Sequence, residues 1–137
     1  MTMADQQLHG KVLYIEDNPI NMSLVETALE SYPGITLLKA STGQEGIRIA
    51  RAEQPDLVLL DMHLPDIGGL EVVRALNEDI ANRQLRVTLL TADPLSMDIV
   101  KAMSLGAYEY WLKPINMNTF DAALKRALSR NRDEDKR

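Results

Sequence analysis

Four short apolar runs in this chain each end on side chains that can bind or transfer a phosphoryl group. The runs 12–15, 57–60, 87–90 and 110–112 are followed by Glu16 and Asp17, by Asp61, by Thr91 and by Lys113, respectively. Carboxylates bind Mg²⁺ readily, and an ammonium group offers a point charge to a phosphate oxygen. These residue types therefore suit a site that combines a divalent cation with a phosphorylated carboxylate.

Asp61 is the candidate nucleophile of this site. A carboxylate at the end of a strand can attack phosphorus and hold an acyl phosphate. Aspartate is also a common turn residue, so the assignment depends on the other run ends. Glu16 and Asp17 beside Asp61 would place three carboxylates in one pocket, where like charges repel unless a cation intervenes. The sequence therefore predicts Mg²⁺, which would also neutralise charge on a transferring phosphoryl group.

Lys113 and Thr91 are the candidate contacts for the phosphoryl oxygens. The Lys113 ammonium group could pair with a phosphate oxygen, or with Asp61 before phosphorylation. The Thr91 hydroxyl could bond one phosphoryl oxygen and pull its loop inward. Pro114 follows Lys113, and an X-Pro bond at this place can be cis, which would aim the lysine inward. A solvated lysine and a capping threonine are the ordinary alternatives for these two residues.

Short apolar runs that alternate with helical patterns indicate the buried strands of a parallel sheet. All strands of such a sheet point the same way, so the run ends meet at the edge where open α/β folds bind ligands. We expect five strand–helix units in an α/β, flavodoxin-like, doubly wound sheet of five parallel strands with five helices. Strand order 2-1-3-4-5 would make the first and third strands neighbours and bring Glu16 and Asp17 beside Asp61.

Capping signals give approximate limits for the five helices. They begin at Asn18-Pro19, at Thr42, near Leu70, at Asp93-Pro94 and at Asn116. An Asn or Thr N-cap followed by Pro or by a capping box supports several of these starts. The third helix is expected to continue to Ile80, and the fourth to end at Gly106.

The bulk composition fits one compact domain of 137 residues. We expect a disordered start segment at 1–10, a folded domain at 11–128 and a charged tail at 129–137. The net charge of −5 argues against nucleic-acid binding. No run approaches the roughly 18 apolar residues of a membrane span, so no membrane contact by this domain is expected. The absence of cysteine excludes thiolate metal sites and is compatible with the cytoplasm.

These residues and their flanking segments resemble the receiver domain of two-component response regulators. The matching segments are "LYIEDNPIN", "PDLVLLDMHLPDIGGLEV", "LLTA" and "GAYEYWLKP", and they span about residues 11–128 with no site position missing. The resemblance implies a signalling module that catalyses only its own phosphorylation and dephosphorylation and is not an enzyme for an external substrate. Asp61 would accept the phosphoryl group from a sensor histidine kinase or a histidine phosphotransfer domain.

The same resemblance assigns a role to each residue of the cation site. Asp17, Asp61 and the backbone carbonyl of His63 would bind Mg²⁺ directly, and Glu16 would act through water. His63 and Asp93 also lie close enough in sequence to the site to affect how readily a hydrolytic water enters.

Switching in this family involves the residues that contact the phosphoryl group. Thr91 and Lys113 would make these contacts. Tyr110 matches the aromatic residue that rotates inward when the threonine moves, although plain strand packing is an equal alternative for it. The face of the fourth helix, fifth strand and fifth helix would then change and could bind a downstream protein or a second copy in a homodimer.

Partner choice in this family depends on the surface near the first helix. The exposed residues expected there are polar and uninformative: Asn21, Ser23, Thr27 and Glu30. The segment "YIEDNPINMSLVE" is similar to receivers attached to hybrid histidine kinases. The domain is therefore expected either to stand alone or to belong to such a kinase.

Two functions from other classes fit the same fold. A Mg²⁺-dependent phosphatase with an aspartyl-phosphate intermediate would need a second acid two residues after Asp61, where this chain has His63. A flavin-binding electron carrier would need a glycine-rich phosphate loop after the first strand, where Glu16 and Asp17 would repel the flavin phosphate. Both alternatives are weaker than the receiver interpretation.

Overall fold

The structure is a computed structural model that describes residues 8–129. Its five strands form one parallel sheet in the order β2-β1-β3-β4-β5, as predicted. The strands are β1 (His9–Ile15), β2 (Gly34–Ala40), β3 (Leu57–Asp61), β4 (Arg86–Thr91) and β5 (Glu109–Leu112). The helices are α2 (Pro19–Leu29), α3 (Gly43–Glu53), α4 (Gly69–Ala75), α5 (Asn77–Asn82), α6 (Met97–Ser104) and α7 (Met117–Leu128).

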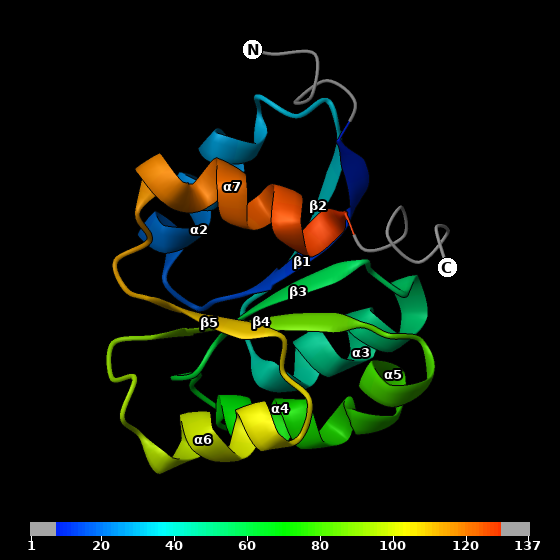
Figure 1. Cartoon of the computed structure of the whole chain (residues 1–137), viewed down its shortest axis with the longest axis vertical. Helices are drawn as coiled ribbons and strands as arrows, with labels where there is room; N and C mark the ends of the chain where they lie inside the picture. Colours follow the sequence, from blue (N-terminus) through cyan, green and yellow to red (C-terminus); the bar gives the residue numbers. More distant parts are fainter. Residues whose placement is uncertain (1–7, 130–137) are drawn as a thin grey trace.

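Helices cover both faces of the sheet, with α2 and α7 on one face and α3 to α6 on the other (Figure 1). Alternate residues of a strand therefore enter two separate cores. Val12 and Tyr14 of β1 pack in the core under α2 and α7, whereas Leu13 and Ile15 pack in the opposite core. All five residues of β3 are buried, because this central strand is covered on both faces.

The predicted helix caps are present at three helix starts. Asn18 Oδ1 accepts hydrogen bonds from the amides of Ile20 and Asn21, at 2.8 and 3.2 Å. Thr42 Oγ1 accepts from the Glu45 amide at 3.1 Å, and the Asn116 side chain caps α7. These bonds satisfy amides that have no partner inside the helix, which explains why the helices begin there.

Two helix predictions were wrong. The third expected helix is divided at Leu76, where φ is −96° and ψ is 10°, so residues 8–129 hold six helices rather than five. Leu76 is fully buried at this bend, and both short helices turn apolar side chains toward one core, which preserves the apolar period across the break. The fourth expected helix begins at Met97 and not at Asp93-Pro94, because Ser96 provides the cap by accepting from the Asp98 amide.

The boundaries of the folded domain differ slightly from those expected. Strand β1 begins at His9, inside the segment assigned to a disordered start, and Ser129 is the C-cap of α7. The remainder of the expected start segment and charged tail, residues 1–7 and 130–137, lies outside the described residues. Among the helices at 8–129, none combines the length and apolar character needed to cross a bilayer.

Candidate functional site

Three carboxylates meet at the carboxyl edge of the sheet. Ile15 of β1 is in register with Leu60 of β3, so the residues that follow both strands lie side by side. One oxygen from each of Glu16, Asp17 and Asp61 lies within 4.8 Å of the others. Glu16 and Asp61 are each only 2% exposed, whereas Asp17 is exposed. The acid cluster is therefore largely buried and opens to solvent on the side of Asp17.

Lys113 is the cation that faces this cluster. Its Nζ lies 2.8 Å from Asp61 Oδ1 and 3.5 Å from Glu16 Oε1. Burial alone would lower the pKa of Lys113, but the hydrogen bond and charge of Asp61, together with Glu16, outweigh it and raise the pKa above its usual value. The lysine therefore stays charged at neutral pH. The peptide bond between Lys113 and Pro114 is cis, as considered from the sequence.

The two oxygens of Asp61 have different surroundings. Oδ1 accepts hydrogen bonds from Lys113 Nζ and from the His63 amide, at 2.8 and 3.1 Å. No donor within residues 8–129 reaches Oδ2. One oxygen is thus held by two donors, and the other remains available to a cation or to an incoming phosphorus atom.

The acid cluster has the donor set that a divalent cation requires. Three carboxylates and one ammonium group leave an excess of negative charge in a mostly buried space, which is unfavourable without a further cation. Oxygen ligands with one open side suit Mg²⁺, which binds one or two carboxylates and keeps several waters. Glu16, Asp17 and Asp61 therefore fit this ion.

Glu16 is held by residues that the sequence analysis did not assign to the site. Its Oε1 accepts from Tyr14 Oη and from Asn21 Nδ2, both at 3.1 Å, and its Oε2 accepts from the Asn18 amide at 3.3 Å. Asn21 was expected to be exposed, but it is half-buried against this carboxylate. Burial and the charge of Glu16 raise the pKa of Tyr14, so its phenol stays protonated and donates.

The Thr91 hydroxyl does not point freely into the site. It accepts from the Asp93 amide at 2.9 Å and donates to the Asp93 carbonyl at 3.1 Å. Thr91 nevertheless lines, with Asp17 and His63, a cavity of about 430 Å³ beside the acid cluster. The predicted contact with a phosphoryl oxygen would require Thr91 to exchange its bonds to Asp93 for a new partner.

The two aromatic residues of β5 lie on opposite faces of the sheet. Trp111 packs edge-to-face against Phe120 in the α2–α7 core, with ring centroids 5.9 Å apart. Tyr110 points to the other side and is 43% exposed. This division follows from the alternation of side chains along a strand.

The loop after Asp61 is anchored to the N-terminus of α3. The carboxylate of Asp66 accepts from the amides of Gly43 and Gln44, at 2.8 and 2.9 Å. The bond from Gln44 is the main cause that lowers the pKa of Asp66, and the bond from Gly43 adds to it. This anchor fixes one end of the loop that carries His63.

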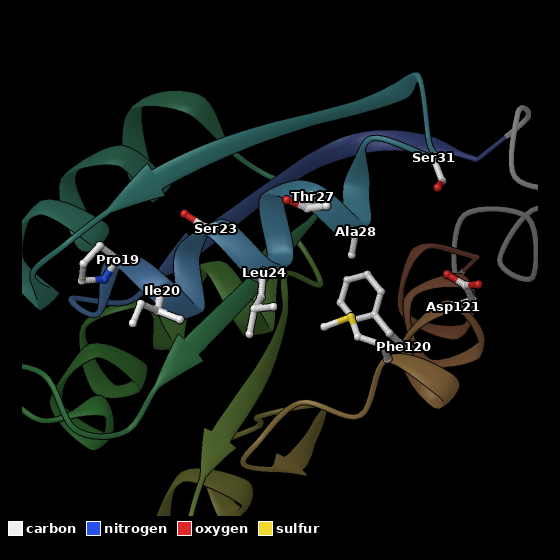
Figure 2. Close-up of a pocket in the computed structure, with 10 residues that line it drawn as sticks. Pro19, Ile20, Ser23, Leu24, Thr27, Ala28, Ser31, Phe120 and Asp121 are labelled. Atoms are coloured by element: carbon white, nitrogen blue, oxygen red, sulfur yellow. The ribbon is translucent and has the colours of Figure 1, made fainter.

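An apolar groove lies between α2 and α7. It has a volume of about 710 Å³ and begins at Pro19, two residues after Asp17. Figure 2 shows Ile20 and Leu24 projecting from the same side of α2, with the Phe120 ring extending from α7. Ile20 is 71% exposed and Leu24 is 49% exposed, so this helix is less polar at its surface than the sequence suggested.

Comparisons of the sequence and of the structure with known proteins both find receiver domains. The family model for the response regulator receiver domain matches residues 12–125. The polar-differentiation response regulator DivK of Brucella ovis is 33% identical over 114 residues, which cover 83% of this chain and 92% of that protein.

Solved structures with the same fold include a receiver domain of a sensor histidine kinase from Pseudomonas aeruginosa. It has a TM-score of 0.77 and 26% identity, covers 88% of this chain and 98% of its own, and was crystallised with a magnesium ion coordinated in the active site cleft. A CheY-like receiver domain protein from Methanospirillum hungatei has a TM-score of 0.81 and 24% identity, covers 92% of this chain and 98% of its own, and shows the shared fold.

Proposed function

Because this chain belongs to the response regulator receiver domain family, we propose that it accepts a phosphoryl group on Asp61 in a Mg²⁺-dependent reaction and signals through the change that follows. The observation that carries this proposal is the position of Asp61. Its carboxylate is buried, is held at Oδ1 by Lys113 and by the His63 amide, and keeps Oδ2 without a donor from residues 8–129.

The transfer proceeds by displacement at phosphorus. An oxygen of Asp61 forms a bond to the phosphorus atom of a donor phosphohistidine, and the bond from phosphorus to the histidine nitrogen breaks. The histidine nitrogen takes the electron pair of that bond and a proton from solvent, so that a neutral imidazole leaves. Water later attacks the acyl phosphate, releases inorganic phosphate and restores the Asp61 carboxylate.

Mg²⁺, when bound, neutralises negative charge on the phosphoryl group. Asp17, Asp61 and the backbone carbonyl of His63 are the residues we assign to hold it directly, with Glu16 acting through water. The Lys113 ammonium group, already within the cluster, remains beside the phosphoryl oxygens and stabilises their charge.

Switching follows from the bonds that the new phosphoryl group offers. Thr91 leaves the Asp93 backbone and donates to a phosphoryl oxygen, and Tyr110 exchanges its exposed position for an inward one. The face of α6, β5 and α7 is altered, and a downstream protein or a second copy of the chain binds there. This is a two-state equilibrium that the phosphoryl group biases.

A hydroxylamine experiment tests the chemical assignment. The protein is incubated with phosphoramidate, a small donor with a phosphorus–nitrogen bond, in Mg²⁺ or in EDTA, and is then treated with hydroxylamine. An acyl phosphate on Asp61 yields a hydroxamate on the peptide that contains this residue, and only in Mg²⁺. Phosphorylation that resists hydroxylamine, or that maps to another residue, would exclude Asp61 as the acceptor.

We further propose that the groove between α2 and α7 receives the donor protein, a sensor histidine kinase or histidine phosphotransfer domain. A donor that delivers phosphorus to Asp61 must cover the mouth of the site, and Ile20 and Leu24 are the exposed apolar residues that follow Asp17 along α2. Burial of such residues stabilises a complex. The domain works in this way in the cytoplasm, either alone or within a hybrid kinase.

Small and large donors distinguish docking from chemistry. Leu24→Asp should slow transfer from a phosphorylated histidine phosphotransfer domain but leave phosphorylation by phosphoramidate unchanged. Val100→Asp on α6, at a residue that is also half exposed, is the matched control and should affect neither reaction. Equal slowing by both variants would count against the groove.

The alternative functions have simple tests. Turnover of a generic phosphomonoester would favour the phosphatase, and a yellow purified protein would favour the flavin carrier. Residues 8–129 form no cap domain over the acid cluster, and Asp17 stays exposed at its mouth. The receiver function therefore accounts for more of the site than either alternative.

A further inference from the structure

Glu16 has more hydrogen-bond donors around it than either of the other two acids. Tyr14 Oη, Asn21 Nδ2 and the Asn18 amide all donate to its carboxylate. Asp61 accepts from two donors, both at Oδ1. Asp17 accepts from none within residues 8–129. The acid with the longest side chain in the cluster is thus also the most constrained.

We propose that Tyr14 is a positioning residue that fixes Glu16 in the orientation needed for its action on the cation through water. This inference rests on the proposed function, because it concerns the same cation site. Asn21 assists from α2, and the pair ties the carboxylate both to β1 and to the first turn of that helix.

The phenol of Tyr14 is well placed for this role. Tyr14 lies two residues before Glu16 on β1, and its side chain is fully buried in the α2–α7 core. The packed ring fixes the position of Oη, so the donor reaches Glu16 Oε1 from a rigid support. The phenol is neutral, so Oη carries a proton that it can donate to the carboxylate.

The distribution of donors determines which oxygen is free. A carboxylate oxygen has two lone pairs, and Oε1 of Glu16 receives two donors while Lys113 Nζ lies 3.5 Å away. Oε2 receives only the Asn18 amide, at 3.3 Å. Oε1 is therefore fully occupied, and Oε2 alone can accept from a water of the cation.

Fixing the side chain also removes a cost that cation binding would otherwise carry. A free glutamate has several rotamers, and ordering it costs conformational entropy that opposes binding. Tyr14 and Asn21 order Glu16 before the cation arrives. The ordinary alternative is that Glu16 merely satisfies the buried hydroxyl of Tyr14, which would affect stability without affecting cation affinity.

Calorimetric titration with Mg²⁺ separates these two roles. In Tyr14→Phe the dissociation constant for Mg²⁺ should rise about 10-fold, the lower end of the usual effect of removing a residue that orients a metal-binding group. Tyr32→Phe is the matched control, because Tyr32 is also buried and its hydroxyl bonds to another carboxylate, that of Asp121. Its Mg²⁺ affinity should equal that of the wild type.

A double-mutant cycle shows whether Tyr14 acts through Glu16. In a Glu16→Ala background, Tyr14→Phe should have no further effect on the Mg²⁺ dissociation constant. Circular dichroism would show whether each variant is folded. If Tyr14→Phe does not fold, Asn21→Ala removes the second donor from a half-buried surface position and should also weaken Mg²⁺ binding.

The inference is wrong if folded Tyr14→Phe binds Mg²⁺ as tightly as the wild type, or if its effect persists without Glu16. Absence of Mg²⁺ binding by the wild type would overturn it together with the cation site. If only the role of Tyr14 is wrong, Asp61 should still be phosphorylated in the presence of Mg²⁺. Mg²⁺ binding without phosphorylation would overturn the proposed function and not the role of Tyr14.

Discussion

Lys113 Nζ donates to Asp61 Oδ1 at 2.8 Å across 52 residues of sequence. The bond joins the ends of two strands that are not neighbours, since β4 lies between β3 and β5. In the described part of the chain, Lys113 is the only basic residue with a nitrogen within 4.0 Å of a carboxylate oxygen of the acid cluster. The charge balance of the site before cation binding therefore depends on Lys113.

Replacing Lys113 by methionine should destabilise the protein when divalent cations are absent. Two carboxylates that are 2% exposed would lose their counter-charge, and we expect a loss of about 2 kcal/mol of unfolding free energy for this partly exposed lysine. Urea unfolding in EDTA measures it. Added Mg²⁺ should reduce the deficit, because a cation that binds the folded state stabilises it.

Lys39→Met is the control for this experiment. Lys39 pairs with Glu26 at the surface, where both side chains are about half exposed. Such pairs contribute about 0 to 1 kcal/mol, so the variant should be nearly neutral and insensitive to Mg²⁺. An equal and Mg²⁺-insensitive loss in both variants would show that Lys113 has no special role in the charge balance.

Gly69 and Gly68 should respond differently to the same substitution. A Cβ at Gly69 would lie 2.5 Å from Met62 Sδ and 2.9 Å from Met62 Cα, next to Asp61, whereas a Cβ at Gly68 meets nothing within 4 Å. Gly69→Ala should therefore cost about 1 to 3 kcal/mol by overpacking and should weaken Mg²⁺ binding. Gly68→Ala should change neither the stability nor the Mg²⁺ affinity by more than a little. Thermal unfolding and Mg²⁺ titration of the two variants would test this difference.

Asp66 should make the stability depend on pH in the acid range. Its pKa is lowered in the folded state, mainly by the Gln44 amide, so its contribution is present above the unfolded pKa of about 3.9 and is lost as pH falls through the lower folded pKa. Asp66→Asn lacks this titration. The unfolding free energy of the variant, measured in urea from neutral to acid pH, should fall less steeply than that of the wild type. Parallel curves would contradict the assignment.

His63 should affect how long the phosphoryl group persists. It lines the same cavity as Asp17 and Thr91, and its side chain is exposed two residues after Asp61. We expect His63→Ala to admit water more readily and to speed dephosphorylation several-fold. Asp98→Asn changes a residue that lines this cavity from α6 and should leave the lifetime unaltered. Equal decay of labelled wild type and His63→Ala would refute the idea.

The sheet and the positions of the acids could be predicted because they depend on a simple rule. In a parallel sheet every apolar run ends at the same edge, so the spacing of Glu16, Asp17 and Asp61 after their runs was sufficient to bring them together. The strand order was predicted from the flavodoxin-like arrangement of five strand–helix units with right-handed crossovers. The sheet and the acid positions thus follow from the spacing of apolar residues and from the order of the elements, and both can be read from the sequence.

Other features depended on information that periodicity does not contain. Leu76 interrupts a helix without interrupting the apolar period, since both halves face one core. Ser96 caps α6 by accepting from the Asp98 amide, whereas Asp93 accepts from the Leu95 amide in the loop before this helix. Tyr14 belonged to an apolar run, so its hydroxyl bond to Glu16 could be seen only when the distance was known.

Intact mass after incubation with acetyl phosphate and Mg²⁺, for the wild type and for Asp61→Asn, tests the central claim most directly. The account predicts a gain of one phosphoryl group in the wild type and none in Asp61→Asn. Asparagine preserves the shape of the side chain but lacks the nucleophilic carboxylate oxygen. A gain in both proteins would place the phosphoryl group on another residue and would contradict the account.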